Sequence, residues 1–189
     1  MLFNSLPFAL FFVVVYLLVC ASHRRFEATL LLGASLLFYT LWHPIYLALL
    51  GIAVGGNYLL LRRIVRSRLA NRQGNARRWL ACSVAFTLGL LAWFKYSALT
   101  IETLAPVLEG VFGLDIQIPK FFLPLGISFY TSQIVALNID IYRGKIEPIE
   151  SLREYALFVC FFPQLIAGPI LRGSQLLPQI QKGGTPTPE

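Results

Sequence analysis

Four polar side chains interrupt the apolar stretch between Leu123 and Arg172 and are the strongest candidates for chemistry: Tyr130, Gln133, Asp140 and Gln164. In hydrocarbon, an unpaired polar group costs several kcal/mol, so polar and irregular segments persist at membrane depth only against other protein or a wet cavity. We therefore interpret these four residues as lining a channel through the membrane or the wall of an active site.

Smaller polar residues accompany these candidates. Ser128, Thr131 and Asn138 share one helical face and would extend the lining of the same path. Ordinary hydrogen bonding between membrane helices is a competing interpretation, and it is slightly favoured for the serine and the threonine. For Asp140, an interfacial ion pair with Arg143, one helical turn away, is the alternative.

Helix breakers indicate how these side chains are positioned. The uncharged run 121–139 has 19 residues, close to the ~20 that span a bilayer. Two helix breakers, Pro124 and Gly126, lie near its start. In the following apolar segment, Pro163 disfavours helix at Phe162, and the Gly168–Pro169 pair breaks the backbone again. We predict two short helical pieces joined inside the membrane, as a broken or re-entrant segment.

Three segments, PLGISFYTSQ, NIDIYRG and FFPQLIAGPILR, together span Pro124 to Arg172. They resemble the signature segments of the membrane-bound O-acyltransferases, in particular the bacterial branch of alginate O-acetyltransferases and teichoic acid D-alanyl transferases. The resemblance implies a multi-pass enzyme that passes an acyl group, acetyl above all, through the membrane to an extracytoplasmic polysaccharide such as alginate. It also implies a thioester donor, acetyl-CoA or acyl carrier protein, no bound cofactor, and a separate periplasmic acyltransferase partner.

Histidine is the usual base for acyl transfer to a hydroxyl, and the chain has two. His23 lies in a basic turn and His43 precedes Pro44, so we interpret both as interfacial residues. The resemblance places the catalytic histidine in a later membrane segment, beyond the end of this sequence. We therefore assign no catalytic residue, and we regard residues 1–189 as the N-terminal part of one membrane domain whose C-terminal catalytic half is absent.

Two other classes of function remain open, a transporter fragment and a non-catalytic membrane assembly subunit, because broken polar helices also serve permeation. A metal site is not expected. The three cysteines, Cys20, Cys82 and Cys160, are isolated in apolar runs and lack the close spacing of metal or redox sites.

Composition places the chain in a lipid bilayer. It is 57% hydrophobic and 13% charged, whereas soluble domains carry about 25% charged residues. Seven of its sixteen Lys and Arg residues lie between Arg62 and Arg78, a stretch without acidic residues. Such a block between apolar runs is typical of a cytoplasmic loop, and it makes nucleic-acid binding a poor explanation of the net charge.

The expected fold is all-α, with five to six membrane segments. The run 28–61 has 34 uncharged residues, too long for one crossing, and a hairpin turn at His43 and Pro44 divides it. That hairpin puts Arg24, Arg25 and the block 62–78 on the cytoplasmic side of the bacterial inner membrane and the N-terminus outside. Trp79 to Phe94 forms the fourth crossing, and the segment between Lys95 and Lys120 contains an amphipathic interfacial helix interrupted by Pro106.

Overall fold

The computed structural model describes residues 6–42, 44–112, 124, 126–167, 173, 177 and 180. Every regular element among them is a helix, which confirms the all-α prediction. The helices are α1 (Leu6–Ala21), α2 (Arg24–Trp42), α3 (Pro44–Leu69), α4 (Gln73–Phe112), α5 (Ile127–Arg143), α6 (Leu152–Cys160) and α7 (Phe162–Ala167).

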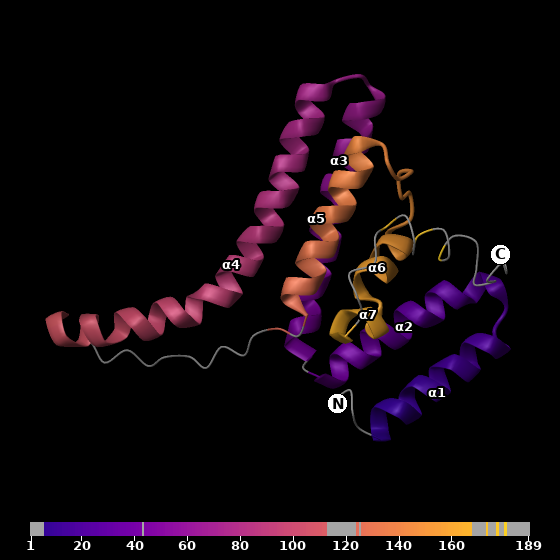
Figure 1. Ribbon diagram of the computed structural model, residues 1–189, viewed down its shortest axis with the longest axis horizontal. Helices are drawn as coiled ribbons and strands as arrows, with labels where there is room; N and C mark the ends of the chain where they lie inside the picture. The colour runs from indigo at the N-terminus through magenta and orange to yellow at the C-terminus, as the bar shows by residue number, and fades with distance from the viewer. Residues whose placement is uncertain are drawn as a thin grey trace.

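A tight antiparallel pair, α3 and α4, forms the frame of the molecule, and α5 packs beside it (Figure 1). Helix α3 and the Gln73–Tyr96 part of α4 are long and apolar enough to cross a membrane, while α1 and residues 26–41 are shorter apolar helices. Several apolar helices in one chain are the pattern of a multi-pass membrane protein, as composition predicted.

The turn predicted at His43 and Pro44 is confirmed in that α2 ends at Trp42 and α3 begins at Pro44. Proline is tolerated in the first turn of a helix because that position has no intrahelical N–H bond to lose. From this turn α2 and α3 diverge as a V, and α6 packs against both of them (Figure 1). The hairpin of α2 and α3 is therefore open, and α6 lies between these two helices.

Helix α4 differs from the prediction in one respect. The backbone remains helical through Pro106 to Phe112, and Figure 1 shows that it bends instead, so that its C-terminal part runs away from the other helices. Side chains between 97 and 112 lie outside the described residues, so the predicted amphipathic face is not described. The part of α4 whose side chains are described, Gln73–Tyr96, is long and apolar enough to cross a membrane, and the predicted crossing from Trp79 to Phe94 lies within it.

Two glycines set the limits of α5, and both adopt the left-handed backbone conformation that other residues rarely take. Gly126 precedes the helix with φ 70°, and Gly144 follows it with φ 74° and donates its backbone N–H to the carbonyls of Asp140 and Ile141. This second arrangement is a common helix C-terminal cap. The first and second signature segments thus place a glycine at each end of one helix.

The break predicted in the last apolar segment is confirmed, but it lies at Phe161, one residue earlier than expected. Helix α7 begins at Phe162 and takes Pro163 into its first turn, where the missing N–H costs little. The backbone N–H of Phe162 donates to the hydroxyl of Ser35 in α2, over 3.2 Å. This bond satisfies one of the four free N–H groups at a helix start. The second predicted break, at Gly168 and Pro169, lies outside the described residues.

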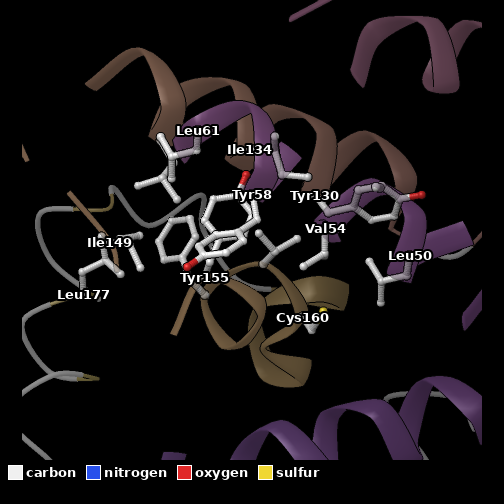
Figure 2. Packing of buried hydrophobic residues seen from close by; sticks show 14 of the residues in the cluster. Leu50, Val54, Tyr58, Leu61, Tyr130, Ile134, Ile149, Tyr155, Cys160 and Leu177 are labelled. Carbon is white, nitrogen blue, oxygen red and sulfur yellow. The ribbon is translucent and has the colours of Figure 1, made fainter. Parts of the chain in front are cut away.

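Two hydrophobic clusters hold these helices together. The larger joins α2, α3, α5 and α6, and Figure 2 shows part of it; the rings of Tyr58 and Tyr155 are in contact there, tilted by 50° with their centroids 5.7 Å apart. The smaller is aromatic: Phe8 of α1 and Phe38 of α2 pack around Phe162 of α7. The outer face of α1 stays exposed and apolar, as expected for a surface that meets lipid or further protein.

Candidate functional site

A continuous hydrogen-bonded network crosses the bundle from α3 to α6. Asn57 of α3 donates to the Ala53 carbonyl at 2.9 Å and accepts from the hydroxyls of Ser83 (2.7 Å) and Thr87 (3.0 Å) in α4. Asn138 of α5 donates to the Ser83 oxygen at 2.8 Å and accepts from the Tyr155 hydroxyl of α6 at 3.3 Å.

Each member of this network is fully buried, at 1% exposure or less. A buried polar group must find a partner or incur its desolvation cost, and these five side chains supply partners to one another. The network therefore fixes the relative position of four helices. Asn138, one of the three smaller polar residues predicted to line a path, takes the alternative role of joining helices.

A second group of buried polar atoms lies in the first two turns of α5. The hydroxyls of Tyr130 and Thr131 and the Gln133 carbonyl oxygen are buried, and none has a hydrogen-bond partner among the described residues. Burying such a group without a partner costs about 1–3 kcal/mol. We call Tyr130, Thr131 and Gln133 the α5 polar row.

The surroundings of the α5 polar row are largely apolar. Tyr130 belongs to the larger hydrophobic cluster, together with Cys160, and Figure 2 shows its ring beside Leu50 and Val54. Its hydroxyl points away from the Tyr58–Tyr155 pair. Ser128, in contrast, is exposed. It was predicted to share a helical face with Thr131 and Asn138, but both of these residues are buried.

Asp140 lies apart from the other predicted site residues. It is ten residues after Tyr130 on the same helix, which corresponds to about 15 Å at 1.5 Å per residue. There it is partly exposed, at the C-terminal end of α5. The guanidinium of Arg68 donates to the carbonyl of Ile141 at this end, so the end of α3 and the end of α5 lie together.

Gln164 is buried in α7 at 4% exposure, and its backbone N–H donates to the Phe161 carbonyl at 3.0 Å. Helix α7 packs on α2, whereas the α5 polar row belongs to the helix beside α3 and α4. Helix α6 contacts α2, α3 and α5, and it ends at Cys160, in the cluster that contains Tyr130. The structure therefore places Tyr130, Gln133 and Gln164 in the interior and Asp140 near an end.

Three members of the network, Asn57, Ser83 and Thr87, were not among the predicted site residues. Ser83 and Thr87 are spaced four apart and so share a face of α4, which is the sequence signal that would have pointed to them. His23 is exposed, and His43 lies outside the described residues. Among the described residues no group of three or more His, Cys, Asp or Glu side chains is placed to hold a metal ion.

Comparison with known proteins gives relatives over nearly the whole chain. It is 35% identical over 181 residues to "Probable alginate O-acetylase AlgI" of Pseudomonas putida, and 36% identical over 181 residues to the protein of that name in Pseudomonas aeruginosa. Each alignment covers 95% of this chain. A peptidoglycan O-acetyltransferase of Helicobacter pylori is 32% identical over 187 residues, covering 85% of this chain.

The chain spans about a third of the length of these relatives, 37%, 34% and 34% in the same order. No protein-family model and no solved structure matches the chain. Its homology to O-acetyltransferases nevertheless confirms the resemblance that the three signature segments indicated, and it agrees with the apolar helices in placing the chain in a membrane.

Proposed function

Because almost the whole chain is homologous to bacterial O-acetyltransferases of the membrane-bound O-acyltransferase type, we propose that it is the N-terminal part of such an enzyme. The complete protein transfers acetyl groups across the inner membrane to an extracytoplasmic polysaccharide, alginate first among the candidates. The observation that carries the proposal is 35% identity over 181 residues to an alginate O-acetylase, with the three signature segments inside the matched length.

The described helices support a role in lining the acyl path. The first signature segment contains the α5 polar row, whose two hydroxyls and one side-chain carbonyl oxygen have no hydrogen-bond partner among the described residues. An acyl thioester brings carbonyl and amide groups that hydrogen-bond to hydroxyl and amide side chains. Tyr130, Gln133 and Gln164 are the proposed lining residues, with Thr131 added by its position in the row. Asp140 is proposed to act at the entrance, because it lies at the end of α5.

The donor in this proposal is acetyl-CoA or an acyl carrier protein on the cytoplasmic side. A periplasmic acyltransferase receives the acetyl group on the other side, and the base that the reaction needs comes from a histidine outside this chain. Expressed alone, the 189-residue chain is therefore expected to insert in the membrane without acetylating a polysaccharide. Acetylation by this chain alone, abolished by changing His23, would contradict the assignment of the base.

A chimera gives the sharpest test. The segment of Pseudomonas putida AlgI that aligns with this chain is replaced by this chain, and the acetyl content of alginate is measured in cells without other AlgI. The unmodified AlgI is the positive control. Restored acetylation supports an acyltransferase role for the chain, because 35% identity leaves most of its side chains different from those replaced.

A chimera that reaches the membrane in normal amount but leaves alginate unacetylated would count against alginate as the substrate. The same exchange into the Helicobacter pylori peptidoglycan O-acetyltransferase, with peptidoglycan acetylation as the measurement, then distinguishes a different acceptor from a different class of function. Failure in both hosts would favour a transporter segment or an assembly subunit.

A further inference from the structure

The outer face of α3 changes from apolar to cationic along its length. Ile45, Ile52 and Leu59 are all exposed, at 67%, 57% and 63%, and they follow one another at intervals of seven residues. Seven residues are close to two helical turns, so the three side chains form one stripe on the side away from the core. Arg66 is the next residue at this interval, and the stripe ends in it.

An open hollow of about 340 Å³ lies at this transition, lined by Leu59, Leu60, Arg62, Arg63, Arg66 and Trp79. The guanidinium of Arg63 lies 5.7 Å from the centre of the Trp79 ring, a cation–π geometry that holds this arginine at the rim. Tryptophan and arginine together are typical of the level at which a membrane protein meets lipid headgroups. We call these six residues the arginine hollow.

The three arginines of the hollow are all exposed, and within the described part of the chain none of them forms an ion pair with a carboxylate. The sequence from 62 to 78 contains no acidic residue. Like charges three and four residues apart on a helix repel one another, so an anion bound between them would be stabilising.

We propose that the arginine hollow binds the phosphodiester headgroup of an anionic phospholipid, such as phosphatidylglycerol. The phosphate pairs with Arg62, Arg63 and Arg66, and an acyl chain lies along the stripe of Ile45, Ile52 and Leu59. The stripe decides between a lipid and a soluble phosphate, because only a lipid has an apolar chain that continues from the phosphate along α3. Guanidinium groups suit this role since their forked donors match phosphate oxygens.

The test measures lipid selectivity around the full chain in bilayers. Spin-labelled phosphatidylglycerol and phosphatidylcholine are compared by electron paramagnetic resonance, which separates lipid held at the protein surface from free lipid. The test variant carries Arg62→Gln, Arg63→Gln and Arg66→Gln. A matched control carries Arg72→Gln, Arg77→Gln and Arg78→Gln, which removes the same charge from the same basic block outside the hollow.

Diffuse attraction of anionic lipid, roughly fivefold per arginine near the membrane surface, is reduced in both variants. We expect the test variant to lose at least about fivefold more selectivity for phosphatidylglycerol than the control, because only the test variant also loses the arginines that pair with the bound phosphate. Equal loss in both variants would overturn the proposal and leave only diffuse surface charge. The unmodified chain provides a test without any variant. Selectivity for phosphatidylglycerol that persists at about 1 M salt supports a specific binding site, and complete loss of this selectivity contradicts it.

Release of spin-labelled phosphatidylglycerol by millimolar inorganic phosphate would assign the hollow to a soluble anion and overturn the lipid proposal. Retention in the presence of phosphate supports the contribution of the apolar stripe. A further variant, Leu59→Gln, interrupts that stripe without changing charge, and the proposal requires it to weaken phosphatidylglycerol retention.

Discussion

Two tyrosines show how one residue type takes opposite roles in the same interior. Tyr130 and Tyr155 are both buried at 1% exposure or less, and both belong to the larger hydrophobic cluster. The Tyr155 hydroxyl donates to Asn138, whereas the Tyr130 hydroxyl has no partner among the described residues. A hydroxyl retained at a cost to stability points to function, and a bonded hydroxyl is explained by stability alone.

The change Tyr130→Phe separates these roles. Removing an unpartnered buried hydroxyl should leave membrane abundance unchanged. The free energy of unfolding should stay the same or rise by up to about 1–3 kcal/mol. Acetyl transfer by the complete chimera should nevertheless fall several-fold if the hydroxyl contacts the acyl donor.

Tyr155→Phe is the matched control, because it deletes the same atom from a paired hydroxyl. Here stability and activity should decline together, as Asn138 loses its donor. Acetyl content of alginate and the melting temperature in detergent are the two measurements. Unchanged transfer with Tyr130→Phe would remove Tyr130 from the acyl path.

Ser83 is the central member of the network, since it donates to Asn57 and accepts from Asn138. Ser83→Ala should lower the free energy of unfolding by about 1–3 kcal/mol, because it leaves polar atoms of two buried side chains with fewer partners. Single hydrogen bonds between membrane helices contribute about 0.6 kcal/mol each, and Ser83→Ala removes two of them, so a loss clearly above about 1.2 kcal/mol would mark the network as cooperative.

The control for that measurement is Ser132→Ala. The Ser132 hydroxyl is exposed and donates only to the Ser128 carbonyl in its own helix, at 2.9 Å. Its removal should change stability little. Equal effects of the two serine variants in detergent-based thermal unfolding would argue that the network does not hold the helices together.

Close packing between helices depends on where small residues lie. Gly56 faces α4 so closely that a Cβ atom there would lie 2.8 Å from the Phe86 ring, whereas a Cβ at the adjacent Gly55 would meet nothing within 4 Å. Small residues at such contacts let membrane helices approach one another. The α3–α4 pair, which has the most extensive contact among the described helices, thus has a specific point of close approach.

Gly56→Ala and Gly55→Ala form a matched pair. Both gain helix propensity, up to about 1 kcal/mol, so their difference reports the contact with Phe86 alone. We expect Gly55→Ala to hold or raise the melting temperature and Gly56→Ala to lie about 1 kcal/mol or more below it, as overpacked contacts do. Indistinguishable melting curves would mean that the Phe86 ring moves aside freely.

The ends of the helices define two opposite sides of the whole molecule. The bond from Arg68 to the Ile141 carbonyl joins the end of α3 to the end of α5, and Arg153 donates to Thr29 at 3.2 Å, joining the start of α6 to the start of α2. Residues 70–72 and 144–151 therefore lie at one end. Lys95, 22 residues after Gln73 on α4, lies about 33 Å away, comparable with a hydrocarbon core of ~30 Å.

Single cysteines at these positions test the orientation. Gln73→Cys and Glu147→Cys, both exposed, should react with an impermeant maleimide only in inverted membranes, because the basic block is expected in the cytoplasm. Lys95→Cys is the control and should react in intact cells. Opposite labelling of Gln73 and Glu147 would contradict the Arg68 geometry, and reversal of all three would show that the basic block is outside.

Hydropathy and helix breakers predicted the helices well, because proline, glycine and charge act locally. The break before Pro44, the break next to Phe162 and the start of α5 after Gly126 belong to this group, whereas the end of α5 at Gly144 was not predicted. The partners of buried polar groups were not predictable in the same way: Asn57 and Asn138 are 81 positions apart and meet through Ser83 only once three helices have packed. The proposed channel-lining role of Tyr130, Gln133, Asp140 and Gln164 stays a prediction.

The order in which the network closes has a consequence for biosynthesis. Among the described residues, the hydrogen-bond partners of Asn57 lie within the α3–α4 pair: its amide nitrogen donates to Ala53, and its oxygen accepts from Ser83 and Thr87. As the ribosome delivers the chain from its N-terminus, this pair can leave the translocon for lipid with its asparagine already shielded. Asn138 has no such local partner and depends on Ser83 being in place, so α5 should remain at the translocon until it docks. If α3 and α4 pair more slowly, α5 should therefore be cleaved by membrane proteases before the helices that precede α5 are cleaved.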